Sequence, residues 1–319
     1  MRWRAALPLG FLVLALVPAS ASAAIPTRTL SCGEVITASV RLASDVTCQA
    51  DFNTDFFGPA LRVAADDVTL DLGGHTVTMN STQSLRSPGV VAVGARVTIR
   101  NGTVDAGGTA VELSGDYGRV VDLQATGREG ISAGGTGVRI ARNTVNAGFG
   151  ISAGGPDLRI TDNSVTGAIA IQVSGAPGGV IARNSVRAST APAIWLNQTD
   201  GTRVVDNQVT AGDDGVWVYS GSGNVVASNF VIGEGRDTTN GDGIVVYEEA
   251  TGTIVRENLV AEHGGDGIQV NSPLTRVAHN AAFYNGLLGI RAVPGTTSGP
   301  GNIAGGNGDP RQCLNVACN

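Results

Sequence analysis

The 319-residue sequence contains no lysine, so all 21 of its basic residues are arginine. This absence excludes every mechanism that requires a catalytic lysine. Charged residues make up only 15% of the chain and aromatic residues only 4%. A disordered chain would carry more charge and a smaller apolar fraction than the 42% present here. The formal charge of −6 argues against a nucleic-acid partner, because nucleic-acid binding needs a basic face.

Long hydrophobic runs are also lacking, except at the N-terminus. There Arg2 and Arg4 precede the apolar run 5–17, and the small residues 19–24 follow it. This order is typical of a signal peptide. The run is shorter than the roughly 20 residues that a membrane span needs. We predict a signal peptide over residues 1–23, and a mature protein that is secreted into the extracellular space without a membrane anchor.

Glycine is abundant, but the 46 glycines follow no strict period of three, which excludes collagen. They belong instead to an internal repeat with steps of about 20 to 24 residues and one longer step between Asn229 and Asn258. Each repeat centres on an asparagine, and the shared positions are Asn143, Asn163, Asn184, Asn207, Asn229, Asn258 and Asn280. Such a period is typical of a solenoid, in which each repeat forms one coil.

Within each coil, apolar and polar residues alternate with the period of a β-strand. The positions three before and two after the asparagine are mostly β-branched, as at Ile140 and Val145. This composition suits strands packed on an inner face. The same columns would hold leucine in a leucine-rich horseshoe, and no helical pattern of useful length follows residue 23. The pattern predicts an all-β solenoid of roughly ten coils.

The repeat resembles the coil of the right-handed parallel β-helix in the pectin-lyase-like superfamily. The opening SCGEVITASVRLASDVTC (31–48) with VTLDLGGHTV (68–77), and the ending GGNGDPRQCLNVACN (305–319), resemble secreted bacterial β-helix proteins. The resemblance implies a single-stranded, right-handed parallel β-helix. It selects no activity, because the superfamily includes lyases, hydrolases, epimerases and adhesins.

We divide the chain into the signal peptide 1–23, an N-terminal cap segment 24–65, the β-helix 66–300 and a C-terminal disulfide tail 301–319. Four cysteines allow three pairings. Ten coils at strand spacing extend about 48 Å, whereas a disulfide joins Cα atoms within ~7 Å. If residues 31–48 and 313–318 lie at opposite ends, only Cys32–Cys48 and Cys313–Cys318 can form, and they would fasten the two ends.

Two polar columns follow from stacking the coils. The asparagines tolerate a left-handed turn conformation, and their amides can bond to one another along the stack. The residue before each asparagine alternates in charge over five coils: Asp122, Arg142, Asp162, Arg183 and Asp206. We interpret the first column as an amide ladder and the second as a ladder of opposite charges that fixes the register.

The strand after each glycine turn presents two outward columns, two residues apart, whose later members are large. Aromatic and amide side chains gather there, and we predict that they bind substrate: Trp195, Asn197, Trp217, Tyr219, Tyr247, Gln269 and Asn271. Exposed aromatics beside amides suit the apolar faces and polar rims of sugar rings. The alternative is that these aromatics only cover the surface of the coils.

Three acids, Asp214, Asp242 and Asp266, precede the glycine of successive coils, and Asp213 adjoins the first. One hypothesis makes the three acids catalytic carboxylates, because adjacent coils would place them at separations used by glycosidases. A second makes Asp213, Asp214 and Asp242 calcium ligands. A third makes them ordinary Asp-Gly turn residues, and strand parity favours this one.

His263 and Arg291 are the remaining catalytic candidates. A β-elimination on a uronic acid needs a base and a cation near the carboxylate; His263 or Tyr247 would supply the base, and Arg291 or Ca²⁺ the cation. The alternative for His263 is a solvated loop residue in Glu262-His263-Gly264-Gly265.

The sequence therefore predicts a protein that binds an extracellular polysaccharide or cell-wall glycan on a groove over the later coils. Processing of that glycan by a lyase, hydrolase or epimerase is one hypothesis, and a non-enzymatic glycan-binding or cell-surface structural protein is the other. Whether the protein is an enzyme stays open at this point. We expect a monomer, no nucleic-acid partner and no cofactor, apart from the calcium alternative.

Overall fold

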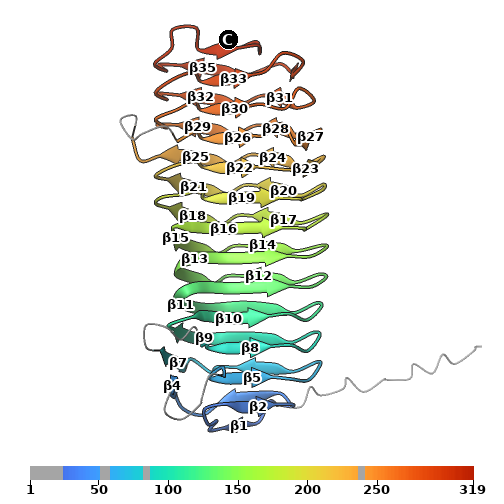
Figure 1. Ribbon diagram of the computed structural model, residues 1–319, viewed down its shortest axis with the longest axis vertical. Coiled ribbons are helices and arrows are strands. Elements are labelled where there is room, and N and C mark those ends of the chain that lie inside the picture. The colour runs from blue at the N-terminus through green and yellow to red at the C-terminus, as the bar shows by residue number, and fades with distance from the viewer. Residues whose placement is uncertain (1–23, 51–57, 82–86, 236–240) are drawn as a thin grey trace, which may run out of the picture.

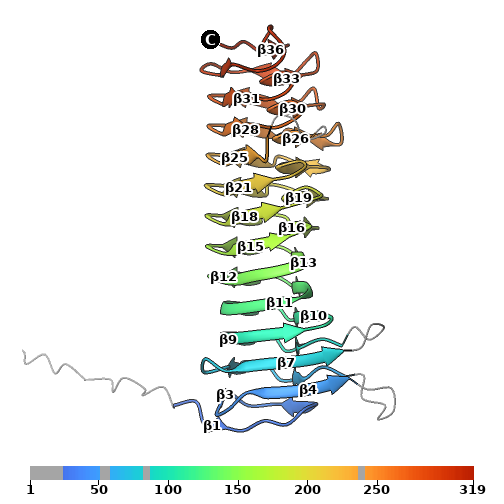
Figure 2. The same ribbon diagram turned by 90° about the vertical axis from the view of Figure 1, so that its left-hand side faces the viewer.

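The chain folds into one long stack of β-coils, shown in Figures 1 and 2. This computed structural model describes residues 24–50, 58–81, 87–235 and 241–319, so the predicted signal peptide 1–23 lies outside the described residues. Every strand pairing in it is parallel, and like positions of successive coils lie in register. The described residues contain no helix. The predicted all-β parallel β-helix of about ten turns is confirmed.

Each coil contributes strands to three faces of the stack. Face 1 contains β1 (Thr27–Arg28), β3 (Val40–Leu42), β6 (Thr69–Asp71), β9 (Thr98–Ala106), β11 (Arg119–Gly134), β12 (Arg139–Ala141), β14 (Arg159–Thr161), β17 (Val180–Ala182), β20 (Arg203–Val205), β24 (Val225–Ala227), β28 (Ile254–Arg256), β31 (Arg276–Ala278) and β34 (Thr297–Ser298). Face 2 contains β4 (Val46–Ala50), β7 (Thr76–Ser81), parts of β9 and β11, β13 (Thr144–Gly154), β15 (Ser164–Gly167), β18 (Ser185–Ala188), β21 (Gln208–Ala211), β25 (Phe230–Gly233), β29 (Leu259–Ala261), β32 (Ala281–Phe283) and β35 (Ile303–Gly305).

Face 3 carries the candidate site. It contains β2 (Glu34–Ile36), β5 (Leu61–Val63), β8 (Val90–Ala92), β10 (Thr109–Leu113), parts of β11 and β13, β16 (Ile169–Ser174), β19 (Ile194–Asn197), β22 (Val216–Val218), β26 (Ile244–Val246), β30 (Ile268–Val270), β33 (Ile290–Ala292) and β36 (Cys313–Leu314). A separate two-stranded pair joins β23 (Gly221–Ser222) to β27 (Ala250–Thr251).

The core runs through the centre of the stack as columns of β-branched side chains. Ile140, Ile160 and Ile181 pair in register on face 1, and each is at most 1% exposed. The same holds on face 2, where Val145 pairs with Val165. Burial of these columns is the main stabilising contribution, at about 25 cal/mol per Å² of apolar surface. The apolar residues of the alternating sequence pattern therefore point into the core of the stack, and the polar residues point to solvent.

The asparagine column forms the expected amide ladder. Asn163 Nδ2 donates to Asn184 Oδ1 at 3.0 Å, and Asn184 Nδ2 donates to Asn207 Oδ1 at 3.0 Å. The backbone N–H groups of Asn163 and Asn184 donate to the same oxygens, at 3.0 and 2.9 Å. The asparagines do not, however, occupy the left-handed region that we expected. That conformation falls on the residue before each one, as at Asp162 (φ 59°).

The alternating column of charges therefore lies at the tight corner between faces 1 and 2. Arg142 makes two hydrogen bonds to Asp122, at 2.7 and 2.8 Å, and Arg183 makes two to Asp162, at 2.8 and 2.9 Å. All four side chains are largely exposed, so solvent screens both pairs and their contribution to stability is small. The pairs join neighbouring coils and disfavour a slip by one coil, which would bring like charges together.

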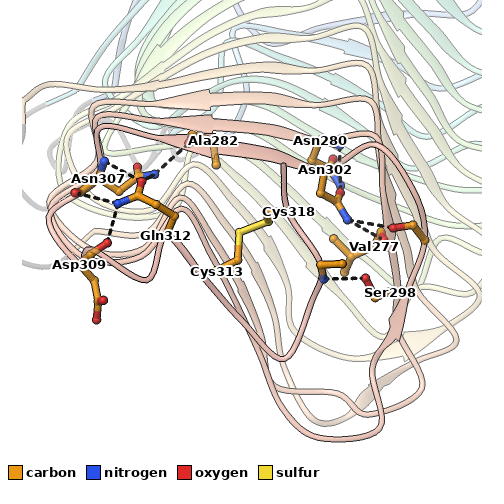
Figure 3. Close-up of a disulfide and its surroundings, with 12 residues drawn as sticks. Val277, Asn280, Ala282, Ser298, Asn302, Asn307, Asp309, Gln312, Cys313 and Cys318 are labelled. Atoms are coloured by element: carbon orange, nitrogen blue, oxygen red, sulfur yellow. Dashed lines mark hydrogen bonds between the residues drawn. A yellow bond between two sulfur atoms is a disulfide. The ribbon is translucent and has the colours of Figure 1, made fainter.

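Disulfides close both ends with the predicted pairing. Cys32 and Cys48 are bonded near the N-terminal end, and Cys313 and Cys318 near the C-terminal end. Figure 3 shows the second bond beside the last coils, where Gln312 Oε1 accepts a hydrogen bond from Asn307 Nδ2 at 2.9 Å. The backbone N–H of Ala317 donates to Ser298 Oγ at 2.9 Å. These contacts cover donors that an open coil would leave unpaired.

Both terminal segments contribute strands to the faces of the stack. Strands β1 to β5 lie within residues 24–65, and β35 and β36 lie within residues 301–319. The boundaries of the cap segment and the disulfide tail stay predictions.

Candidate functional site

The outward column of face 3 lies in the register that the sequence predicts. Strand pairing places its members on successive coils in the order Glu112, Ser132, Ser152, Gln172, Trp195, Trp217, Val245, Gln269 and Arg291. The side chains change from small to large near Trp195. Tyr219 and Tyr247 lie in the next outward column, two residues after Trp217 and Val245, so four aromatic residues lie together on three adjacent coils.

We call these four residues, Trp195, Trp217, Tyr219 and Tyr247, the aromatic strip. The Trp195 and Trp217 rings meet edge to face with centroids 6.0 Å apart. Tyr247 lies 5.3 Å from both Trp217 and Tyr219, measured between ring centroids. Tyr219 is 39% exposed and the other three are half-buried. The rings therefore hold one another in place while part of their surface faces solvent.

Amide side chains lie on the same face as the strip. Asn197, on the strand of Trp195, accepts a hydrogen bond from Ser220 Oγ at 2.9 Å. Asn271 Nδ2 donates to Gln269 Oε1 at 2.9 Å, one coil beyond Tyr247. All three amides are half-buried. The structure thus brings all seven predicted substrate-binding residues onto face 3, within four adjacent coils.

The three acids Asp214, Asp242 and Asp266 form a second column, which we call the carboxylate column. It lies in the turns that lead into β22, β26 and β30. Asp214 Oδ1 accepts the backbone N–H of Asp242 at 2.5 Å, and Asp242 Oδ1 accepts that of Asp266 at 2.5 Å. Asp266 Oδ1 in turn accepts the N–H of Leu288 at 2.9 Å. Each acid therefore joins its coil to the next.

The second carboxylate oxygen distinguishes the three acids. Asp214 Oδ2 accepts a hydrogen bond from Trp217 Nε1 at 2.5 Å, and Asp266 Oδ2 accepts one from Arg291 in an ion pair. No described residue donates to Asp242 Oδ2, and the Asp242 side chain is only half-buried. Asp242 is therefore the one acid of the column with an oxygen left for a ligand, within the described part of the chain.

Burial dominates the electrostatics of the carboxylate column. It raises the pKa of Asp214 to about 6 and the pKa of Asp242 to about 7, because the charged form is poorly solvated there. The carboxylates of Asp266 and Asp214 raise the pKa of Asp242 further, and Arg291 opposes them. Burial raises the pKa of Tyr247, and the carboxylates of Asp214 and Asp242 raise it further. The aromatic strip and the carboxylate column are thus electrostatically coupled.

His263 lies inside the coil and is not a solvated loop residue. Its side chain is 1% exposed, and burial lowers its pKa to about 4, so it is neutral at pH 7. Its backbone N–H donates to Asn285 Oδ1 at 3.1 Å, and the N–H of Asn285 donates to Asn307 Oδ1 at 2.9 Å. His263 therefore heads a second internal polar ladder. Its ring lies beside Gly243, the residue after Asp242.

The structure shows no ligand set for the calcium alternative. Among the described residues, no three histidine, cysteine, aspartate or glutamate side chains are grouped so that they could hold a metal ion. Asp214 and Asp242 each use one oxygen on a backbone N–H. Burial raises the pKa of Asp213.

Sequence reasoning missed a cavity on the earlier coils of the same face. It encloses about 410 Å³ and is lined by Gly108, Thr109, Glu112, Arg128, Glu129, Phe149 and Ser152. A second hollow of about 240 Å³ shares Ser152 and extends to Gln172, which pairs in register with Trp195. Concave surface therefore leads along face 3 to the aromatic strip. The sequence carries no signal for this cavity, because the glycines between faces 2 and 3 in β11 and β13 predict a turn, whereas both strands continue unbroken there.

The family of the chain follows from its sequence and its fold. A model described as a right-handed β-helix region matches residues 66–230 and 119–282. Together these ranges cover more than half of the chain, and the chain therefore belongs to this family. A search of curated proteins finds no match. No described helix is long and apolar enough to cross a membrane.

Solved structures share the fold at low sequence identity. The Dettilon tailspike protein matches with a TM-score of 0.61 and 14% identity, over 89% of this chain and 60% of its own. DFA-IIIase from Arthrobacter chlorophenolicus A6, without its lid, matches with a TM-score of 0.56 and 18% identity, over 77% and 70%. A double mutant of the periplasmic alginate epimerase AlgG matches with a TM-score of 0.51 and 13% identity, over 89% and 73%. These matches show the fold alone.

Proposed function

We propose that the protein binds an extracellular polysaccharide along face 3 and processes it with Asp242 as the acid–base group. The observation that carries this proposal is the contact between the aromatic strip and the carboxylate column, made by Trp217 Nε1 and Asp214 Oδ2 at 2.5 Å. One of the solved structures with the same fold is named as an alginate epimerase, and alginate is a polysaccharide. This likeness supports the proposed class of ligand.

Binding follows from the shape and chemistry of face 3. Sugar rings present flat apolar faces, which stack on half-exposed aromatics, and hydroxyl rims, which bond to amides. The aromatic strip supplies the first kind of contact, and Asn197, Gln269 and Asn271 supply the second. The hollows that continue from Ser152 to Gln172 extend the same surface over earlier coils. A chain of several sugars would therefore lie along the stack.

Catalysis follows from the unequal partners of the three acids. Asp214 and Asp266 have both oxygens engaged, whereas Asp242 Oδ2 has no donor among the described residues. A pKa of about 7 matches the operating pH of a general acid or base. The protonated form of Asp242 would donate to a leaving glycosidic oxygen, and the ionised form would take a proton from a sugar carbon or a water. Arg291 orients Asp266 and moderates the rise in the pKa of Asp242.

Two variants separate binding from chemistry. The double variant Trp195→Ala and Trp217→Ala should lose binding to the glycan, measured by affinity electrophoresis on a panel of neutral and acidic polysaccharides. The matched control is Tyr117→Ala and Tyr284→Ala, which removes two exposed rings away from the aromatic strip. Normal binding by the tryptophan variant would rule out the groove.

The variant Asp242→Asn should lose turnover by about 100-fold or more, because general acid–base groups contribute about 10²–10⁴ in rate, while its affinity changes less than twofold. Asp162→Asn is the matched control, since Asp162 lies in the exposed column of charges at the corner between faces 1 and 2. Equal turnover of Asp242→Asn and the unmodified protein would remove Asp242 from the chemistry.

A second candidate function is glycan binding without catalysis. The backbone hydrogen bonds made by all three acids favour it, because they give the carboxylate column a structural task that needs no substrate. Under this function, the tryptophan variant loses binding, and no member of the polysaccharide panel is altered by the unmodified protein.

Export through the predicted signal peptide completes the proposal. Two disulfides among the described residues fit an oxidising compartment outside the cytoplasm. N-terminal sequencing of the protein from the culture medium should begin at Ala24. A mature protein that retains residues 1–23 would contradict this part of the proposal.

A further inference from the structure

Face 1 carries an uncompensated column of arginines, which we call the arginine column. Arg119, Arg139 and Arg159 occupy the same outward position on β11, β12 and β14, and strand pairing places them in register on adjacent coils. All three are exposed, and none forms an ion pair within the described chain. Like charges directly opposite each other on neighbouring strands are destabilising. The column therefore carries a repulsion that no ion pair to its three arginines offsets within the described residues.

The fold does not require arginine at this position. In the later coils the same column reads Val180, Arg203, Val225, Ile254 and Arg276, so each later arginine lies between uncharged neighbours and no two are adjacent. Elsewhere in the chain, arginines on neighbouring coils are neutralised by carboxylates: Arg142 is paired with Asp122, and Arg183 with Asp162. Three adjacent arginines without ion-pair partners are thus a local feature of these coils. An anionic ligand would neutralise them.

A cavity lies over the arginine column. It encloses about 440 Å³, and its lining consists of Thr69, Thr98, Arg100, Arg119, Val121, Asp122, Arg139, Ala141, Arg142, Arg159 and Thr161. Arg100 is paired with Asp71 at 3.1 Å, and Arg142 with Asp122 at 2.7 Å. The cavity therefore has a net positive charge from the arginine column, with threonine hydroxyls beside it as further hydrogen-bond donors.

We propose that the arginine column binds an acidic polysaccharide, through carboxylate or sulfate groups repeated along its chain. The planar guanidinium group of arginine binds such anions through two parallel hydrogen bonds. Adjacent arginines are about 4.8 Å apart along the stack, so successive anionic groups of one chain would engage successive coils. A single small anion would neutralise only part of the column. This site lies on face 1 and is distinct from the aromatic strip of face 3.

A nucleic acid fits the cavity less well than a glycan. Proteins that bind single strands combine a positive groove with aromatic side chains on which the bases stack, and the cavity over the arginine column has no aromatic residue in its lining. The chain as a whole also has a formal charge of −6. A polyanion without bases is therefore the ligand that the lining favours.

The test compares two triple variants of the mature protein. The first, Arg119→Gln, Arg139→Gln and Arg159→Gln, removes the three adjacent arginines. The control, Arg203→Gln, Arg256→Gln and Arg276→Gln, removes the same number of charges from face 1 at non-adjacent positions: Arg203 and Arg276 occupy the same outward position beside uncharged neighbours, and Arg256 is paired with Glu257. Biolayer interferometry measures binding to dextran sulfate, polygalacturonate, neutral dextran and a single-stranded DNA. The salt concentration is varied from about 50 to about 300 mM, a range that includes the physiological value of about 0.15 M.

We expect the column variant to lose at least 10-fold in affinity for the two acidic polysaccharides, and to show a weaker dependence of that affinity on salt, because fewer ion contacts remain. The control should lose less than threefold. The same column variant should unfold at a slightly higher temperature in low salt, since a repulsion is relieved. A variant with Trp195→Ala and Trp217→Ala should keep this polyanion binding, which separates the inference from the proposed function of face 3.

Three results would overturn the inference. One is unchanged binding by the column variant, and another is an equal loss by the column and control variants, which would make the effect one of total charge. The third is tighter binding of the single-stranded DNA than of either acidic polysaccharide, which would replace the glycan by a nucleic acid.

Discussion

Replacement of Asp242 by asparagine should change the pH dependence of stability. Burial raises the pKa of Asp242 to about 7 in the folded protein, above its ordinary value of 3.8. The folded state therefore holds this proton more tightly than the unfolded state, and the resulting stabilisation is full below about pH 4 and is lost as the pH rises through 7. A shift of about three pKa units corresponds to about 4 kcal/mol, at 1.36 kcal/mol per unit.

The Asp242→Asn variant cannot titrate at this position, but its Oδ1 can still accept the N–H of Asp266. The free energy of unfolding, from urea titrations at pH 4.5, 6 and 8, should therefore fall less with rising pH in the variant than in the unmodified protein. We expect the difference between the two proteins to change by about 2–4 kcal/mol across this range, in favour of the variant at pH 8. A difference that is independent of pH would refute the raised pKa.

A variant whose stability should depend on pH in the opposite direction provides the control. Arg183 holds the pKa of Asp162 below its ordinary value through two hydrogen bonds. The contribution of the Asp162–Arg183 pair to stability is therefore present above the ordinary pKa of Asp162 and is lost as the pH falls through the lowered pKa. Asp162→Asn should be slightly destabilising at pH 8 and neutral in acid, and the effect should be small because the pair is exposed.

Three further substitutions test individual contacts. Asn207→Ala should lower the free energy of unfolding in urea by about 3 kcal/mol, because it leaves buried partners of the amide ladder unsatisfied; a loss below 1 kcal/mol would contradict the ladder as a stabilising element. His263→Asn should keep the turnover of the unmodified protein, since His263 heads an internal ladder, and a 100-fold loss would restore the histidine as a catalytic base. Trp217→Phe removes the donor to Asp214 Oδ2 and should raise the pKa of Asp214 in carbon-13 NMR titrations, whereas an unchanged midpoint would contradict that hydrogen bond.

The sequence predicts the fold well because a stacked coil repeats the same local pattern at every turn. The Asn163 column, the register of Trp195 with Trp217, and the pairing Cys313–Cys318 all follow from that repetition, and the structure confirms them. The left-handed residue was placed one position too late, since the pattern marks the corner of the coil but not which residue turns it.

The candidate site is only partly readable from the sequence. The partners of Asp242 and Asp266 depend on how each turn directs its second oxygen, and no spacing specifies this. The burial of His263 depends on a turn that folds inward, whereas its glycine-rich surroundings suggest a solvated loop. The cavity at Glu112 lies where β11 and β13 continue from face 2 to face 3 without a break, although the glycines of these segments predict a turn. The register of the strands therefore predicts which residues share a column, whereas the partners and the burial of the acids and of His263 depend on the shape of the turns.

The most direct test of glycan processing on face 3 is mass spectrometry of neutral and acidic polysaccharides after incubation with the mature protein and with its Asp242→Asn variant, followed by proton NMR of any polymer that stays intact. We expect the unmodified protein to alter at least one polymer and the variant to leave it unchanged. Fragments that carry an added water would identify a hydrolase, fragments lighter by one water a lyase, and an intact polymer with altered sugar configuration an epimerase. A panel that is bound but neither cleaved nor epimerised, or equal turnover by the two proteins, would contradict the acid–base role of Asp242.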